Sequence, residues 1–167
     1  MAEGNRTSPQ IRRIVTGHDP TGKAVVWKDL PVTNHKYPDE GMSSSLIWVT
    51  DSAPTDFTID KDEGDRVMGT APPLGGTRFS VLELQPGNKV HGLHRTDSLD
   101  YVICLSGQVD MLLDDSIVTM QLGDVMVQRG TNHAWVNRGT EVARIACILI
   151  DGVPKREGSI SGVQDAR

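Results

Sequence analysis

The side chains best suited to chemistry in this chain are two histidines and an aspartate, namely His94, His133 and Asp100. Two imidazoles and one carboxylate can form one face of an octahedral site for a divalent first-row metal and leave positions open for a substrate. An imidazole, whose ordinary pKa is about 6.5, is also suited to general-base work, and a carboxylate can orient it. The three residues therefore point either to a metal site or to a metal-free acid–base site.

Short segments rich in β-branched residues, separated by turns, must bring these residues together. Such segments at regular spacing are typical of an all-β sandwich or barrel. No segment has helical periodicity over three turns, and only a short helical piece is expected, between 51 and 70. The predicted strands are 11–16, 24–28, 45–50, 78–84, 100–105, 108–113, 117–122, 125–128, 134–137 and 142–150.

Alternation along these strands selects the side chains that share a face, because residues two apart in a strand point the same way. One polar set comes from an earlier strand and a second from a later one: His94, Thr96, Asp100 and Cys104, then His133, Trp135 and Asn137. Inward polar groups in an apolar barrel are costly unless they satisfy one another or hold a ligand. We therefore expect a substrate pocket, with Trp135 either as its apolar wall or as plain core packing.

The spacing of glycines around these residues has two halves. Gly87, His94, Asp100 and Gly107 form the first, and Gly123-Asp124, Gly130, His133 and Asn137 form the second. Taken in order, the halves resemble the two motifs of the cupin superfamily, and the resemblance covers 76–151. It implies a double-stranded β-helix, or jelly-roll, barrel that carries an N-terminal β-extension.

The chain departs from that pattern at the expected metal ligands. Thr96 stands where the first motif usually has its second histidine, and Asp100 stands where glutamate is usual. The resemblance then implies at best His94, Asp100 and His133 as ligands of one divalent Fe, Mn, Zn or Ni ion, with His91 as a further candidate if a bulge turns it inward. The metal-free alternative, in which His94 or His133 is the general base, stays open.

From this site we expect a lyase or isomerase that removes a proton beside a carbonyl of an apolar metabolite, in a dehydration, decarboxylation, isomerisation or cyclisation. Secondary metabolism is expected by analogy. Trp135, Thr96, Asn137 and Cys104 are the expected substrate contacts, and Arg129 is one candidate for a cation that steadies an enolate. The alternatives are an Fe(II)-dependent dioxygenase and a non-catalytic small-molecule binder. Thr96 favours the lyase or isomerase over the dioxygenase, because the loss of a ligand weakens the binding of redox iron more than it impairs acid–base catalysis.

A chain of 167 residues is long enough for one domain with a full core. We expect a flexible tail over 1–10, a β-extension with loops over 11–75, the barrel over 76–153 and a second flexible tail over 154–167. Such extensions in the superfamily often pair with a second subunit, so the resemblance implies a homodimer. The strands at 11–16 and 24–28 are the candidates for exchange, because unpaired edges invite pairing.

Composition argues against several classes of partner. The net charge is −5, from 17 basic and 22 acidic residues, and no basic block is present, which disfavours nucleic acid. No apolar run reaches the length of a membrane span, and the first ten residues do not resemble an export signal. Cys104 and Cys147 lie in apolar segments, so we expect buried free thiols and a cytoplasmic location, with a disulfide or a reactive thiol as the alternative.

Overall fold

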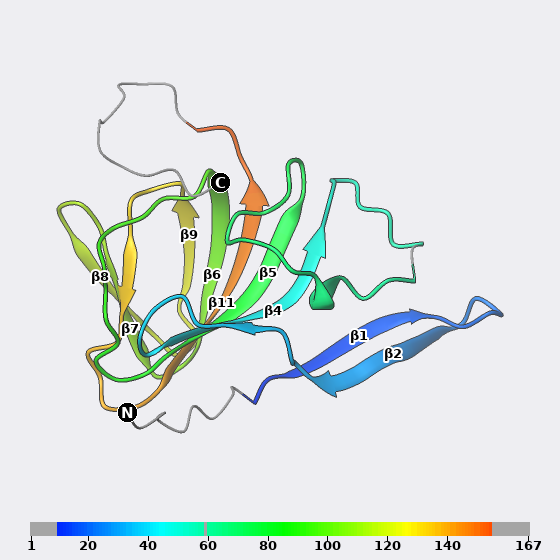
Figure 1. Ribbon diagram of the computed structural model, residues 1–167, viewed down its shortest axis with the longest axis horizontal. Coiled ribbons are helices and arrows are strands. Elements are labelled where there is room, and N and C mark those ends of the chain that lie inside the picture. The colour runs from blue at the N-terminus through cyan, green and yellow to red at the C-terminus, as the bar shows by residue number, and fades with distance from the viewer. Residues whose placement is uncertain (1–9, 59, 155–167) are drawn as a thin grey trace.

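The computed structural model describes residues 10–58 and 60–154, which form eleven β-strands and one turn of 3-10 helix (Figure 1). The predicted all-β class is confirmed, and the helical turn, Glu63–Asp65, lies in the segment where one was expected. Apart from Gln10 and Pro154, the predicted tails lie outside the described residues. The strands are β1 Arg12–His18, β2 Ala24–Pro31, β3 His35–Lys36, β4 Met42–Thr50, β5 Thr77–Leu84, β6 Ser98–Ser106, β7 Gln108–Leu112, β8 Ile117–Gln121, β9 Val125–Arg129, β10 Ala134–Val136 and β11 Ala143–Asp151.

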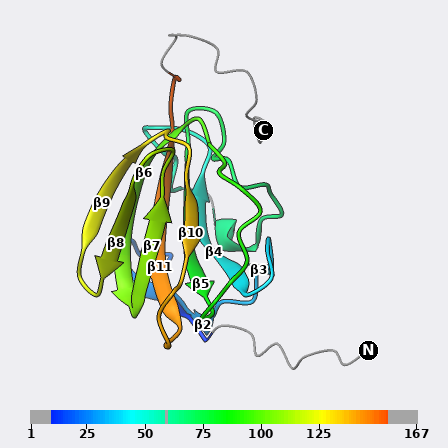
Figure 2. The ribbon, with the colours of Figure 1, turned by 90° about the vertical axis from the view of Figure 1, so that its left-hand side faces the viewer.

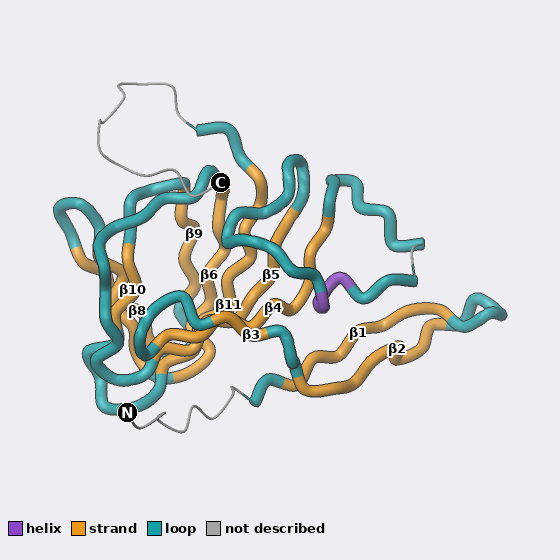
Figure 3. The backbone as a smooth tube through the Cα atoms, viewed as in Figure 1, coloured by secondary structure: helices purple, strands orange, loops and turns teal. Residues whose placement is uncertain are grey.

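Two antiparallel sheets enclose the core. One has six strands in the order β3-β4-β5-β11-β6-β9, and the other has three in the order β10-β7-β8, so the chain crosses between sheets repeatedly. Figure 2 shows the barrel with the three-stranded sheet toward the viewer, and Figure 3 shows the loops that join the strands at both ends. The buried core cluster draws Val102 and Ile145 from the larger sheet and Val109 and Met111 from the smaller. The hydrophobic effect therefore holds the two sheets face to face.

Alternation along β6 explains how a strand can carry polar groups into this core. Ser98, Asp100, Val102 and Cys104 are buried, whereas Tyr101 between them is exposed. A two-residue period of this kind is what a strand with one face on a core produces. The strand therefore delivers a carboxylate and a hydroxyl to the same face as its apolar side chains.

The larger sheet starts earlier in the chain than the resemblance implied. β4 pairs with the whole of β5, from Met42 opposite Leu84 to Thr50 opposite Thr77, and β3 adds to its other edge. Only the β1–β2 hairpin forms a sheet of its own, and it projects from the barrel (Figure 1). No helix in the described part of the chain is long and apolar enough to span a membrane.

The hairpin is attached to the barrel at two points. The buried guanidinium of Arg13 donates to both carboxylate oxygens of Asp62, at 2.8 and 2.6 Å. Trp27 packs edge-on against Trp48 of β4, with 6.4 Å between the ring centroids. Such a buried ion pair and aromatic contact hold the hairpin against β4 and against the segment that carries Asp62.

Candidate active site

His94 and His133 are joined through their backbones, although they are distant in the sequence. The amide of His94 donates to the carbonyl of His133 at 2.9 Å, and the amide of His133 donates back at 2.8 Å. This isolated antiparallel bridge lies outside the named strands, between the segment that precedes β6 and the residue before β10. It brings the two imidazole rings to 4.4 Å between centroids. The expected convergence of the two histidines is therefore present.

Asp100 reaches the same cavity from the opposite sheet. In the register of the larger sheet it lies between Leu149 of β11 and Gln128 of β9. Its carboxylate accepts a hydrogen bond from the hydroxyl of Ser98 at 2.5 Å. Burial raises the pKa of Asp100 to about 6, against the opposing effects of Ser98 and the positive charge of Arg78. A carboxyl group with such a pKa can exchange a proton near neutral pH.

These groups line one cavity of about 120 Å³ between the two sheets. Strands β4, β5, β6, β9 and β11 form one side of it, and the segments around His94 and His133 form the other. Polar and apolar side chains are mixed on its wall, as in most small-molecule sites. The residues that line the cavity include Ser44, Arg78, Ser80, His94, Thr96, Asp100, Gln128, His133, Trp135 and Leu149.

His133 is held by one ring nitrogen and presents the other. Its Nδ1 lies 2.9 Å from Nε2 of Gln128 and 3.0 Å from the carbonyl oxygen of Thr131. The amide nitrogen suits a bare Nδ1 and the carbonyl suits a protonated one, but in either tautomer Nδ1 is engaged by the protein. Nε2 is then the nitrogen left for a substrate. Burial, with a further contribution from His94, lowers the pKa of His133 to about 4, so the ring is neutral at pH 7.

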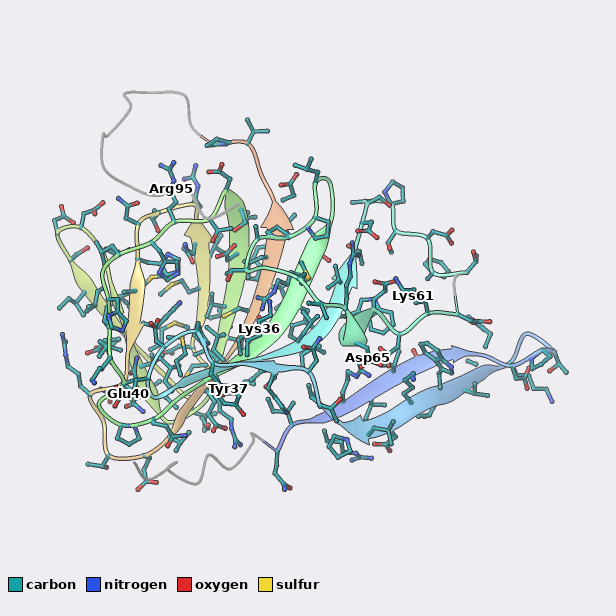
Figure 4. The ribbon with its side chains drawn as sticks, in the orientation of Figure 1. Lys36, Tyr37, Glu40, Lys61, Asp65 and Arg95 are labelled. Carbon is teal, nitrogen blue, oxygen red and sulfur yellow. The ribbon has the colours of Figure 1, made fainter. Side chains whose placement is uncertain are left out.

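His94 lies at the mouth of the cavity, where it is exposed on one side. Partial burial lowers its pKa, and the negative charge of Asp39 opposes that effect. The next residue, Arg95, faces away from the cavity and lies 3.9 Å from the carboxylate of Asp97 (Figure 4). A neutral imidazole at the mouth is suited to bind or relay a proton between the cavity and solvent.

The donor set does not fit the metal ion that the resemblance implies. Among the described residues, no three His, Cys, Asp or Glu side chains are grouped closely enough to hold one ion. Thr96 occupies the wall where a second histidine would stand, and the cation of Arg78 shares the cavity with Asp100. His91 does not replace the missing ligand: its side chain is 71% exposed and lies 3.5 Å from Asp39.

Two of the expected substrate contacts do lie on the cavity wall. Thr96 is buried and lines the cavity, and so does Trp135, whose ring meets that of His133 edge-on with 5.9 Å between centroids. An aromatic wall beside an imidazole supports a flat or apolar substrate. Their roles as substrate contacts stay predictions.

The other two expected substrate contacts, Cys104 and Asn137, do not line this cavity. Cys104 shares the inward face of β6, but it lies beyond the cavity in the hydrophobic core, with its thiol toward the carbonyls of Ser106 and Gly107. Asn137 is fully buried and serves the backbone instead: its Nδ2 donates to the carbonyls of Leu84 and Glu141 at 2.9 and 2.8 Å. Alternation along a strand predicts which face a side chain lies on, but not how far along the strand the cavity extends. Cys104 and Asn137 lie beyond the residues that line it.

Sequence analysis missed the polar side chains that β5 and β9 bring to the cavity. Arg78, Ser80 and Leu82 alternate along β5 and all line it, and Gln128 of β9 contacts His133. The sequence does indicate that Arg78 and Phe79 lie on opposite faces of their strand. Which of the two faces points inward depends on the pairing of β5 with β4 and β11. Arg129, one of the cations considered from the sequence, is exposed on β9.

Comparison with known proteins finds cupin-domain proteins. The family model of the cupin domain matches residues 80–149. Phomopsin biosynthesis cluster protein C' of Diaporthe leptostromiformis is 31% identical over 95% of this chain and 92% of its own length. The cupin-domain-containing oxidoreductase fogC of Aspergillus ruber is 31% identical over 85% of this chain and 73% of its own. A cupin 2 conserved barrel domain protein from Salinispora arenicola matches 71% of this chain and 82% of its own, with 17% identity and a TM-score of 0.45.

Proposed function

Because the chain belongs to the cupin family, we propose that it is a small-molecule enzyme that performs acid–base chemistry with His133, His94 and Asp100. The observation that carries the proposal is a buried neutral imidazole that shares a cavity with a carboxyl group whose pKa is about 6. Pairs of titratable groups whose environments push their pKa values in opposite directions are typical of acid–base sites.

The reaction class proposed is proton transfer at a carbon beside a carbonyl. Nε2 of His133 takes the proton, and the electron pair of the broken C–H bond moves into the enolate. In a lyase, the enolate re-forms the carbonyl while a leaving group departs from the next carbon and takes a proton from Asp100. In an isomerase, the proton returns to a different carbon of the same molecule. Both outcomes need no oxidant and use only groups that line the cavity.

A place in secondary metabolism is part of the proposal. The phomopsin relative is named for a biosynthesis cluster, and so is oryzines biosynthesis cluster protein J of Aspergillus oryzae, which is 28% identical over 87% of this chain. The cavity is small and its surface is mostly apolar, which suits a compact metabolite with few polar groups.

An oxidoreductase is the second candidate function, because the fogC relative carries that name. One such reaction, an Fe(II)-dependent oxygenation, would need a metal at His94, Asp100 and His133. The replacement of a ligand by Thr96 weighs against it. Oxygen uptake that depends on added iron would favour this candidate over the lyase or isomerase.

A homodimer, with the β1–β2 hairpin as the exchanged element, is also proposed. The hairpin exposes Ile14, Val26 and Leu30. Apolar side chains on a projecting two-stranded sheet are better satisfied against a second subunit than in water. A cytoplasmic location stays a prediction, with which the buried free thiols of Cys104 and Cys147 are compatible.

The test of the enzymatic proposal is exchange of α-protons for deuterium in D₂O, followed by NMR on a panel of cyclic ketones. Wild-type protein is expected to accelerate exchange of at least one ketone over buffer, and His133→Gln to lose that acceleration by about 100-fold or more. His18→Gln, at an exposed histidine that ends β1, is the matched control and should match wild type. Exchange that survives His133→Gln would remove His133 from the chemistry.

A further inference from the structure

We propose that the cavity is built for an anionic substrate and that Arg78 binds its carboxylate. This inference rests on the proposed function of the same site and names the class of substrate. It starts from a charged side chain that sequence analysis did not single out and that the acid–base chemistry does not use.

Arg78 is buried on β5, with 5% of its surface exposed, and it lines the cavity. Its Nη1 donates to the hydroxyl of Ser80 at 2.9 Å, and its Nη2 donates to the hydroxyl of Ser44 at 3.1 Å. A guanidinium carries five N–H donors, so these two bonds leave three. Nε is one of them: it is buried and has no partner among the described residues.

Arg78 has no direct ion pair in the described part of the chain, and a second buried arginine shows the contrast. Arg13 is 8% exposed, and its guanidinium is paired with both oxygens of Asp62. Arg78 is buried to the same degree but is held by two neutral hydroxyls, and no carboxylate of the described residues forms an ion pair with it. Burying a cation without a counterion is costly, so a fold that does so leaves room for an anion.

Asp100 shares the cavity but does not serve as that counterion. Both residues are paired with Leu149 of β11, one from each side, so they lie two strands apart. Two strand spacings separate their backbones by about 10 Å. The Asp100 carboxylate is bonded to Ser98, and its pKa is raised, which is the opposite of what a close ion pair with a guanidinium produces.

The position of Arg78 also suits the proposed chemistry. The guanidinium approaches the cavity from the larger sheet, and His133 approaches it from the segment before β10 on the other side. A carboxylate held at Arg78 by the paired donors of a guanidinium would fix one end of the substrate in distance and orientation. Fixing one end limits which carbon can meet Nε2 of His133, and such positioning is a large part of catalysis.

The test uses benzoate and benzamide, which have nearly the same shape and differ in charge. Each is titrated into the full-length protein in buffer free of carboxylate and phosphate, and the indole signal of Trp135 is followed by NMR, assigned with Trp135→Phe. Wild type is expected to bind benzoate at least tenfold more tightly than benzamide. Arg78→Met should remove that preference, while Arg129→Met, at an exposed arginine, should keep it. Equal binding of the two probes by wild type would overturn the proposal.

The thermal midpoint separates ligand binding from a structural role. Without benzoate, Arg78→Met should unfold at the same temperature as wild type or higher, because an unpaired buried charge is removed. A fall of several degrees together with a retained preference for benzoate would assign Arg78 to the fold and overturn the proposal. Arg78→Lys keeps the charge without the planar fork, and it should bind benzoate with intermediate affinity.

The same titration distinguishes this inference from the proposed function. His133→Gln should keep the preference for benzoate while losing α-proton exchange. If His133→Gln keeps exchange but Arg78→Met loses the preference, the acid–base assignment fails and the anion site stands. If Arg78→Met keeps the preference and His133→Gln loses exchange, the anion site fails and the acid–base assignment stands.

Discussion

At the scale of single residues, the environments of His133 and Asp100 differ in the way that proton transfer requires. Burial acts on both, but it disfavours the cation of one and the anion of the other. It lowers the pKa of His133 and raises the pKa of Asp100, so both groups are biased toward their neutral forms. Near neutral pH, His133 is therefore a free base, and Asp100 can gain or lose its proton.

The raised pKa of Asp100 predicts a pH dependence of stability. Because its folded pKa, about 6, exceeds the ordinary value of 3.8, the stabilisation is present below about pH 4 and is lost as pH rises through 6. Asp100→Asn removes this dependence, so its free energy of unfolding relative to wild type should rise by about 3 kcal/mol between pH 4 and 7. Urea unfolding at intervals of pH measures the difference. A constant difference across that range would contradict a raised pKa.

Metal removal tests the donor set at the same scale. Prolonged dialysis against a chelator should leave α-proton exchange within about twofold of the untreated protein, because the proposed steps use only side chains. Metal content is measured on the same samples, from protein purified without a histidine tag. Activity that falls on dialysis and returns with one added metal would show that the reduced ligand set is sufficient.

At the scale of elements, the connection from β10 to β11 depends on one buried amide. Asn137 donates to the carbonyls of Leu84 and Glu141, and its Oδ1 accepts from the amide of Gly139 at 2.9 Å. Asn137→Ala leaves those buried groups without partners and should destabilise the protein by about 3 kcal/mol in denaturant unfolding. Asn132→Ala, whose amide bonds to Asp114 at an exposed position, is the control and should cost less than about 1 kcal/mol.

The turn between β6 and β7 gives a second prediction at this scale. Gly107 has φ of +69°, and a Cβ there would lie 2.8 Å from the carbonyl oxygen of Val142. Gly123 also has positive φ, at +90°, but a Cβ there would meet open space. Gly107→Ala should therefore destabilise more than Gly123→Ala, which carries only the backbone penalty of about 1–2 kcal/mol. Thermal unfolding of both variants checks the order, and equal losses would contradict it.

The strands could be predicted because a two-residue period and turn residues are local properties. The proximity of His94 and His133 could be anticipated from the cupin motifs, but the backbone conformation around His94 could not. His94 was expected to continue into the strand of Asp100, whereas β6 begins at Ser98 and His94 forms an isolated bridge with His133, just before β10. The place of Arg78 in the cavity could not be predicted, because pairing with β4 and β11 determines which face of β5 points inward. Register and depth are tertiary properties that one strand does not encode.

At the scale of the whole molecule, the β1–β2 hairpin gives the protein its elongated outline (Figure 1). Ile14→Asp with Val26→Asp places two charges on its exposed apolar positions. If the hairpin forms the dimer contact, wild type sediments as a dimer and this variant as a monomer with an unchanged circular dichroism spectrum. Leu122→Asp, at an exposed position beyond β8, is the control and should remain a dimer. A monomeric wild type would end the dimer proposal.

The bridge between His94 and His133 has a consequence for how ligands enter. Two backbone hydrogen bonds join the segment that carries His94, at the mouth of the cavity, to the buried His133 just before β10. An outward movement of the His94 segment would break both hydrogen bonds and separate the two imidazole rings. A widened cavity mouth and a paired His94 and His133 therefore exclude each other, and the same two bonds control ligand entry and the geometry of the site.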